Sequence, residues 1–377
     1  MRPWMKALGM LACGLCLGCG ARTGLPLPDG GGPAPRDGGM DAPAVTDGAT
    51  CEPTRLGLRQ PGAQVLFALD RSASMASNLQ GVTPLPGEPS RWELVVDALQ
   101  QVLVDADPLL RFGATLYPDV EPGDSGPQAL CNVDPGIDLP PGPNNESTLN
   151  DLLASSTDPN GGTPTAVALR EVRDFFEANP AASDTPRNVV LATDGAPNCN
   201  PDTGVHRSRC VCTSERSFCL DPMVGDYNCL DEDRTVAEIE GLFMDLGIPV
   251  YVVGIENPAR PDLGDVLDRM ADAGGRPRDE PGERRFYDVQ EPGDLQAAFA
   301  SITDGIARCT FTVQRTPTDD AAVEVRVARE PVPRDPVDGW DFTADDRSEI
   351  TLFGSACERA SAGGVRVTAR ETCPDGG

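Results

Sequence analysis

Three short polar side chains follow an apolar segment near the start of the chain. Val65 to Leu69 are all apolar, and Asp70, Ser72 and Ser74 follow at spacings of two residues. An apolar run of this length predicts a buried strand of a parallel sheet, with Asp70 at its carboxyl end. Ligands bind at that edge of open α/β sheets. Because Mg²⁺ prefers carboxylate and hydroxyl oxygens, the spacing predicts a metal site.

Two later segments carry residues that could complete this site. Gly161-Gly162-Thr163 precedes a segment of helical periodicity, and the apolar run at residues 189–193 ends in Asp194. In this order the three segments resemble the von Willebrand factor type A domain and its metal-ion-dependent adhesion site. The resemblance covers roughly residues 64–308 and implies five metal ligands: Asp70, Ser72, Ser74, Thr163 and Asp194. Mg²⁺ is the expected ion, with Mn²⁺ or Ca²⁺ as alternatives.

Each piece of this pattern also has an ordinary structural interpretation. Asp70 is a residue type that commonly caps helices. Thr163 could cap the helix that follows it, with Pro164 in the favoured first position. Asp194-Gly195 is a common turn pair. Because each motif alone is weak, the metal prediction rests on the three occurring together in order.

The rest of the chain predicts how these segments are positioned. Apolar runs alternate with segments of helical periodicity up to residue 308, which predicts an α/β fold with a doubly wound, mostly parallel sheet. A helix is expected from the capping box at Ser90 and Glu93, and a short edge strand at residues 137–139. Beyond Cys309 the periodicity changes to two, which predicts a small antiparallel β appendage at residues 309–377. The type A domain is therefore expected at residues 51–308, with a cysteine-rich insertion at 196–233.

The first fifty residues have the pattern of an exported chain. Arg2 and Lys6 precede a short apolar segment, as in a signal peptide at residues 1–19. Residues 16–19 resemble a bacterial lipobox, although Cys16 stands where leucine is usual, and Cys19 would then carry the lipid. Cleavage after Ala21 is the alternative, giving a secreted or periplasmic protein. Residues 20–50 are rich in Gly, Pro and Asp and predict a disordered linker, so we expect a lipid-anchored protein at the outer membrane or cell surface.

Charge excludes one class of partner. The formal net charge is −28, and Lys6 is the only lysine. We therefore expect no basic patch for phosphate and no binding of nucleic acid.

Ten cysteines remain after the three in the leader, and disulfides are the default in an exported chain. They are Cys51, Cys131, Cys199, Cys210, Cys212, Cys219, Cys229, Cys309, Cys357 and Cys373. We expect Cys51–Cys309 to join the ends of the type A domain and Cys357–Cys373 to close the last hairpin. By parity, Cys131 then pairs with one of the insertion's five cysteines. A zinc site in the insertion is the alternative, but residues 210–212 lack the usual ligand spacing.

The residues do not favour catalysis. Ser72 or Ser74 as a nucleophile would need a base, and the only histidine, His206, lies in the insertion. By family resemblance, a phosphotransferase that uses Asp70 as its nucleophile would usually require a second aspartate at the position of Ser72. We therefore expect a module that is not an enzyme and that binds a carboxylate on a protein or surface partner through its metal. The alternative is a structural surface lipoprotein whose metal only fixes loops. A type A domain assisting an ATP-driven machine is disfavoured, because the leader removes the chain from ATP.

Overall fold

The computed structural model describes most of the chain from residue 52 onward. The described ranges are 52–60, 62–104, 110–156, 159–180, 185–202, 209–214, 216–255, 260–278, 282–344, 346–361 and 366–373. The predicted leader with Cys19, the predicted linker, Cys51 and His206 lie outside these ranges. Within them, no helix has the length and apolarity that crossing a membrane requires.

A six-stranded sheet forms the centre of the fold, in the order β5-β4-β3-β6-β7-β8. Its neighbouring strands are parallel except for β5, which is antiparallel to β4. The strands are β3 (Gln64–Asp70), β4 (Arg111–Tyr117), β5 (Leu139–Gly142), β6 (Arg187–Thr193), β7 (Val250–Ile255) and β8 (Tyr287–Val289). The predicted doubly wound, mostly parallel sheet is confirmed, and β3, which carries Asp70, lies in its interior.

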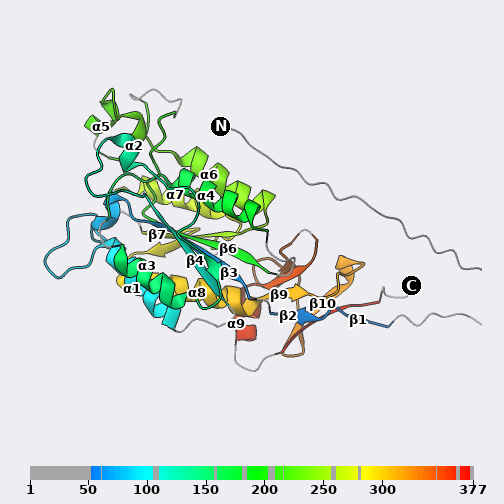
Figure 1. The fold of residues 1–377 in the computed structure, drawn as a ribbon. Helices are drawn as coiled ribbons and strands as arrows, with labels where there is room; N and C mark the ends of the chain where they lie inside the picture. The colour runs from blue at the N-terminus through cyan, green and yellow to red at the C-terminus, as the bar shows by residue number, and fades with distance from the viewer. Residues whose placement is uncertain are drawn as a thin grey trace, which may run out of the picture. The chain divides into compact units, whose positions relative to one another are not determined.

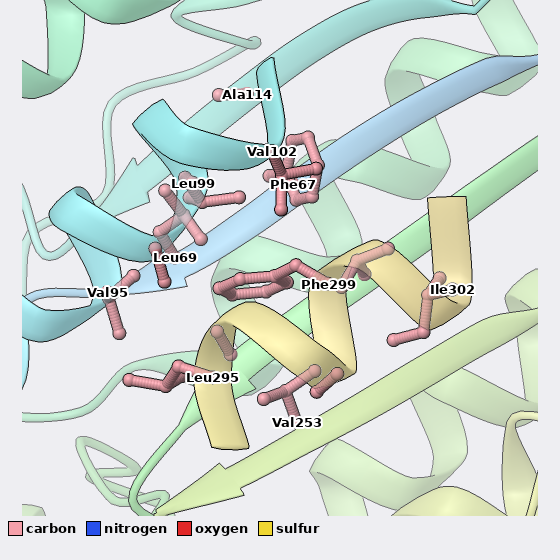
Figure 2. Packing of buried hydrophobic residues seen from close by; sticks show 14 of the residues in the cluster. Phe67, Leu69, Val95, Leu99, Val102, Ala114, Val253, Leu295, Phe299 and Ile302 are labelled. Carbon is pink, nitrogen blue, oxygen red and sulfur yellow. The ribbon is translucent and has the colours of Figure 1, made fainter. Parts of the chain in front are cut away.

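Helices cover both faces of this sheet (Figure 1). One face carries α1 (Arg91–Val104), α3 (Glu146–Ser155) and α8 (Pro292–Cys309), and the other carries α4 (Thr165–Ala178), α6 (Glu232–Glu240) and α7 (Asp262–Ala273). Figure 2 shows Phe67 of β3 packed between α1 and α8, with its ring 5.9 Å from that of Phe299. The predicted capping box starts α1, since the backbone N–H of Ser90 donates to the Glu93 carboxylate at 2.7 Å.

The last part of the chain, together with two short strands that precede the central sheet, forms two four-stranded sheets in the orders β1-β14-β10-β11 and β12-β13-β9-β2. We call these two sheets the C-terminal β region. Its strands are β1 (Thr54–Arg55), β2 (Leu58–Arg59), β9 (Thr310–Val313), β10 (Val323–Val327), β11 (Glu330–Val332), β12 (Trp340–Phe342), β13 (Glu349–Leu352) and β14 (Val367–Glu371). All their pairings are antiparallel. The short strands β1 and β2 precede the central sheet in the chain but pair with C-terminal strands.

The edge strand begins two residues later than predicted. The prediction placed it at residues 137–139, whereas β5 runs from Leu139 to Gly142. The cause is Asp138, whose carboxylate accepts the backbone N–H of Leu116 at 2.8 Å. That donor on β4 is therefore satisfied by a side chain rather than by a neighbouring strand.

Two predicted disulfides are wrong. Cys309 pairs with Cys357, with 5.3 Å between their Cα atoms, so neither Cys51–Cys309 nor Cys357–Cys373 forms. The reason is helix α9 (Gly354–Ser361), which the sequence analysis did not predict and which carries Cys357 against the end of α8. Cys373 is also disulfide-bonded.

The remaining elements are short and lie mainly in the loops. They are η1 (Ala73–Ala76), α2 (Pro127–Leu130), α5 (Arg216–Leu220), η2 (Asp226–Asn228), η3 (Gly241–Asp245) and η4 (Asp320–Ala322). Among them, η1 follows β3 directly and carries Ser74, so it orders the loop of the predicted metal site.

Candidate metal centre

The loop after β3 gathers three of the predicted ligands around one carboxylate. Asp70 is completely buried, and its Oδ1 accepts the backbone N–H of Ser72 at 2.9 Å. Its Oδ2 accepts the hydroxyl of Thr193 at 2.7 Å. The hydroxyl oxygens of Ser72 and Ser74 lie 3.0 Å apart. The backbone bond fixes the turn, and the Thr193 bond fixes the carboxylate, so both orient Asp70.

Asp194 comes to the same place because β6 lies beside β3. The two strands are parallel with Leu69 opposite Ala192, so Asp70 and Asp194 both lie at the carboxyl edge. Both carboxylates are buried, at 0% and 3% exposure. Burial, and then the negative charge of Asp194, raise the pKa of Asp70 to about 7. In the absence of a cation, this edge therefore disfavours a second negative charge.

Thr163 lies on the adjacent loop. The backbone N–H of Ala73 donates to the carbonyl of Gly161 at 3.1 Å, which joins the Thr163 loop to the Asp70 loop. Asn198 holds Thr163 in place, because its side-chain oxygen accepts the Thr163 backbone N–H at 2.8 Å. The N-cap of α4 is Pro164, so the alternative interpretation of Thr163 as a helix cap is wrong.

A disulfide packs against the loop that carries Thr163. Cys131 pairs with Cys199, with 5.6 Å between their Cα atoms, as the parity argument expects. A Cβ placed on Gly162 would lie 2.4 Å from the sulfur of Cys199, so only glycine fits there. Its neighbour Gly161 has a φ of +84°, which favours glycine as well. Gly161 and Gly162 are therefore each required before Thr163, for two different steric reasons.

The other cysteines of the insertion form disulfides and do not form a zinc site. The sulfurs of Cys210, Cys219 and Cys229 lie within 4.8 Å of one another. However, Cys210 pairs with Cys229, and Cys219 pairs with Cys212. A sulfur in a disulfide is not the thiolate that binds zinc, so the zinc alternative is wrong for these residues.

Arg91 is a site residue that the sequence analysis missed. Its Nη1 donates to Oδ2 of Asp194 at 2.8 Å, and the two side chains are 1% and 4% exposed. Nε and Nη2 of Arg91 and Oδ1 of Asp194 are buried and have no hydrogen-bond partner among the described residues. The capping box at Ser90 and Glu93 indicated where the helix starts, but it gave no signal that Arg91 points inward.

The donor set fits a divalent cation. Two carboxylates and three hydroxyl-bearing residues lie on three adjoining loops, and all are hard oxygen donors of the kind that Mg²⁺ prefers. The unpartnered Oδ1 of Asp194 is the clearest sign, because a buried carboxylate oxygen without a partner is costly.

Residues 64–301 match the sequence model of the von Willebrand factor type A domain. The chain belongs to this family.

Solved structures that match this chain come from several organisms. The PilB minor pilin from Streptococcus sanguinis is 18% identical with a TM-score of 0.44, and the match covers 66% of this chain and 62% of that one. The vWF domain of the type V pili tip protein Mfa5 from Porphyromonas gingivalis is 16% identical with a TM-score of 0.39, covering 66% and 96%. Manganese-loaded TRAP protein from Plasmodium vivax is 14% identical with a TM-score of 0.36, covering 67% and 76%. The chain thus spans less than two thirds of the pilin's length, and no curated protein matches it.

Proposed function

We propose that this type A domain binds a divalent cation at the carboxyl edge of its sheet and uses it to bind a carboxylate on a protein or surface partner. Ser72, Ser74 and Thr163 would supply neutral hydroxyl oxygens, and Asp70 and Asp194 would supply the charge. Mg²⁺ is the expected ion, with Mn²⁺ and Ca²⁺ as alternatives. The observation that carries the proposal is the pair of buried carboxylates at one sheet edge, of which Oδ1 of Asp194 has no hydrogen-bond partner among the described residues.

The charges at this edge favour an acidic partner. Asp70 and Asp194 contribute two negative charges when ionised, and the buried Arg91 guanidinium offsets one of them. A bound divalent cation would leave the site with net positive charge in a poorly solvated place. The attraction of a partner carboxylate is stronger there than in water. The cation would supply the electrostatic attraction, while the chain's own residues orient it.

The proposal places the protein outside the cytoplasm, held by a lipid on Cys19. Four disulfides among the described residues support an oxidising compartment. Under this proposal the protein binds and does not catalyse. A secreted or periplasmic form is the alternative if Cys19 carries no lipid.

The test is capture of surface proteins by the full chain, with Mg²⁺ or with chelator. We expect partners that are retained with Mg²⁺, released by chelator and lost with Asp70→Ala. Asp97→Ala is the matched control, because Asp97 is an exposed carboxylate on α1. If Asp70→Ala retains the same partners while remaining folded, the binding proposal fails and the structural lipoprotein takes its place.

A further inference from the structure

The outer face of one C-terminal sheet concentrates positive charge. Along β10, Val325 and Val327 point into the core, so Glu324 and Arg326 alternate onto the opposite face. A groove of about 490 Å³ runs over this face. Five arginines and one glutamate line it: Arg55, Arg326, Arg329, Arg366, Arg370 and Glu324. The groove therefore carries a formal charge of +4, five minus one, in a chain of net charge −28. The expectation that the chain has no basic patch is wrong at this face, because arginines from four separate segments meet here although no lysine is present.

Most of this charge is not neutralised. Glu324 accepts from Arg370 at 2.7 Å and also pairs with Arg326. Arg55, Arg329 and Arg366 are exposed and form no ion pair with any other described residue. Moreover, Arg55 on β1 lies directly opposite Arg370 on β14. Like charges in that arrangement destabilise a sheet, so this face is not optimised for stability.

The chemistry of the groove fits phosphate. The planar guanidinium group binds phosphate through two parallel hydrogen bonds, which a lysine does not do. The position of the groove indicates where the phosphate comes from. Residues 1–50 lead directly into β1, which contributes Arg55 to the groove. A lipid on Cys19 would tether the chain to the membrane, and a basic groove would offset the repulsion between the strongly negative body and anionic lipids.

We propose that this arginine groove binds the phosphate groups of anionic lipids at the membrane surface. The choice of lipid over other phosphates rests on the anchorage proposed above, whereas the groove itself is independent of the metal centre. Cys131 lies beside the metal loop and follows α2 directly in the chain. Figure 1 shows α2 at one end of the central sheet and β1 and β10 at the other. Docking through the groove therefore leaves the metal edge facing away from the membrane.

The experiment is co-sedimentation of the full chain with vesicles, in chelator so that the metal centre plays no part. All proteins carry Cys19→Ala, so that no acyl chain contributes. We expect binding to vesicles containing phosphatidylglycerol to exceed binding to phosphatidylcholine alone. The variant Arg329→Gln/Arg366→Gln should bind the anionic vesicles roughly 30-fold more weakly, since each arginine near a membrane contributes about 1 kcal/mol. Arg329→Lys/Arg366→Lys should retain more binding than the glutamine variant.

The matched control is Arg111→Gln/Arg269→Gln, which removes two partly or fully exposed arginines outside the groove. This control should bind like the parent, and circular dichroism should show that all variants are folded. Equal binding by the groove variant and the control would overturn the proposal. Arginine-dependent binding of inorganic phosphate without binding to anionic vesicles would also overturn it, because the groove would then serve a soluble phosphate.

Discussion

The metal edge buries its charged side chains, whereas the arginine groove exposes most of its own. At the metal edge, Asp70, Asp194 and Arg91 are almost completely buried at the end of a parallel sheet. In the groove, Arg55, Arg329 and Arg366 stand exposed on the open face of an antiparallel sheet. The cause is how each sheet is covered. Helices pack on both faces of the central sheet, so its polar groups are confined to the strand ends, whereas one face of the C-terminal sheet remains open.

The difference predicts that removing a charged side chain lowers the free energy of unfolding more at the metal edge than in the arginine groove. A buried charge whose partner is deleted remains unsolvated, while an exposed charge is stabilised by water. The stability effects of single substitutions therefore test the comparison.

Arg91→Met gives the largest expected effect. It leaves Asp194 buried and unpaired, so we expect unfolding in urea to show a loss of roughly 3 to 5 kcal/mol in chelator. Saturating Mg²⁺ should recover part of this loss, because a cation would replace the missing positive charge. The control is Arg370→Met, whose pair with Glu324 is 41% and 22% exposed and should cost less than about 1 kcal/mol. Equal losses in the two variants would break the comparison.

The disulfides give a second, somewhat smaller test. Removing Cys131–Cys199 with paired serine substitutions should cost roughly 2 to 4 kcal/mol, since the bond closes a loop of 68 residues. It should also weaken Mg²⁺ binding measured by calorimetry, because this disulfide packs under Gly162. Removing Cys212–Cys219, which spans seven residues, should leave Mg²⁺ affinity unchanged. If both removals affect Mg²⁺ equally, the support that we assign to Cys131–Cys199 is not specific.

Glu349 gives the smallest expected effect. It is half-buried in the C-terminal β region and bonded to the hydroxyl of Thr343, and burial raises its pKa. A carboxyl whose pKa is raised on folding destabilises the fold when ionised, so Glu349→Gln should stabilise the protein at pH 7 by less than about 1 kcal/mol. The gain should shrink as pH falls through the folded pKa and vanish below the unfolded one. Urea titrations at several pH values measure it, and a gain that grows on acidification would contradict this assignment.

The sequence was informative where spacing along one strand determines the geometry. Asp70 at the end of an apolar run predicted the sheet edge, because a strand of fixed direction must deliver its last residue there. It was uninformative where a side chain's orientation depends on a distant packing partner. Arg91 lies at a helix start, where arginine is ordinarily exposed, and only its approach to Asp194 distinguishes it.

The disulfide errors have a similar origin. Pairing Cys309 with Cys51 assumed that the type A domain closes on itself. Instead, α9 delivers Cys357 to the end of α8, and an eight-residue helix in a segment of alternating strands gave no clear periodicity. Likewise, β1 and β2 are two residues long, too short for a pattern that would assign them to the C-terminal β region.

The central claim is that the carboxyl edge of the sheet binds a divalent cation through Asp70. Calorimetric titration of Mg²⁺ into the full chain and into Asp70→Asn tests this most directly, because the asparagine keeps the shape and removes the charge. Asp97→Asn serves as the control for the loss of one carboxylate. We predict one Mg²⁺ bound by the parent and by Asp97→Asn, and no measurable binding by a folded Asp70→Asn. Equal Mg²⁺ affinity in Asp70→Asn and the parent would contradict the account.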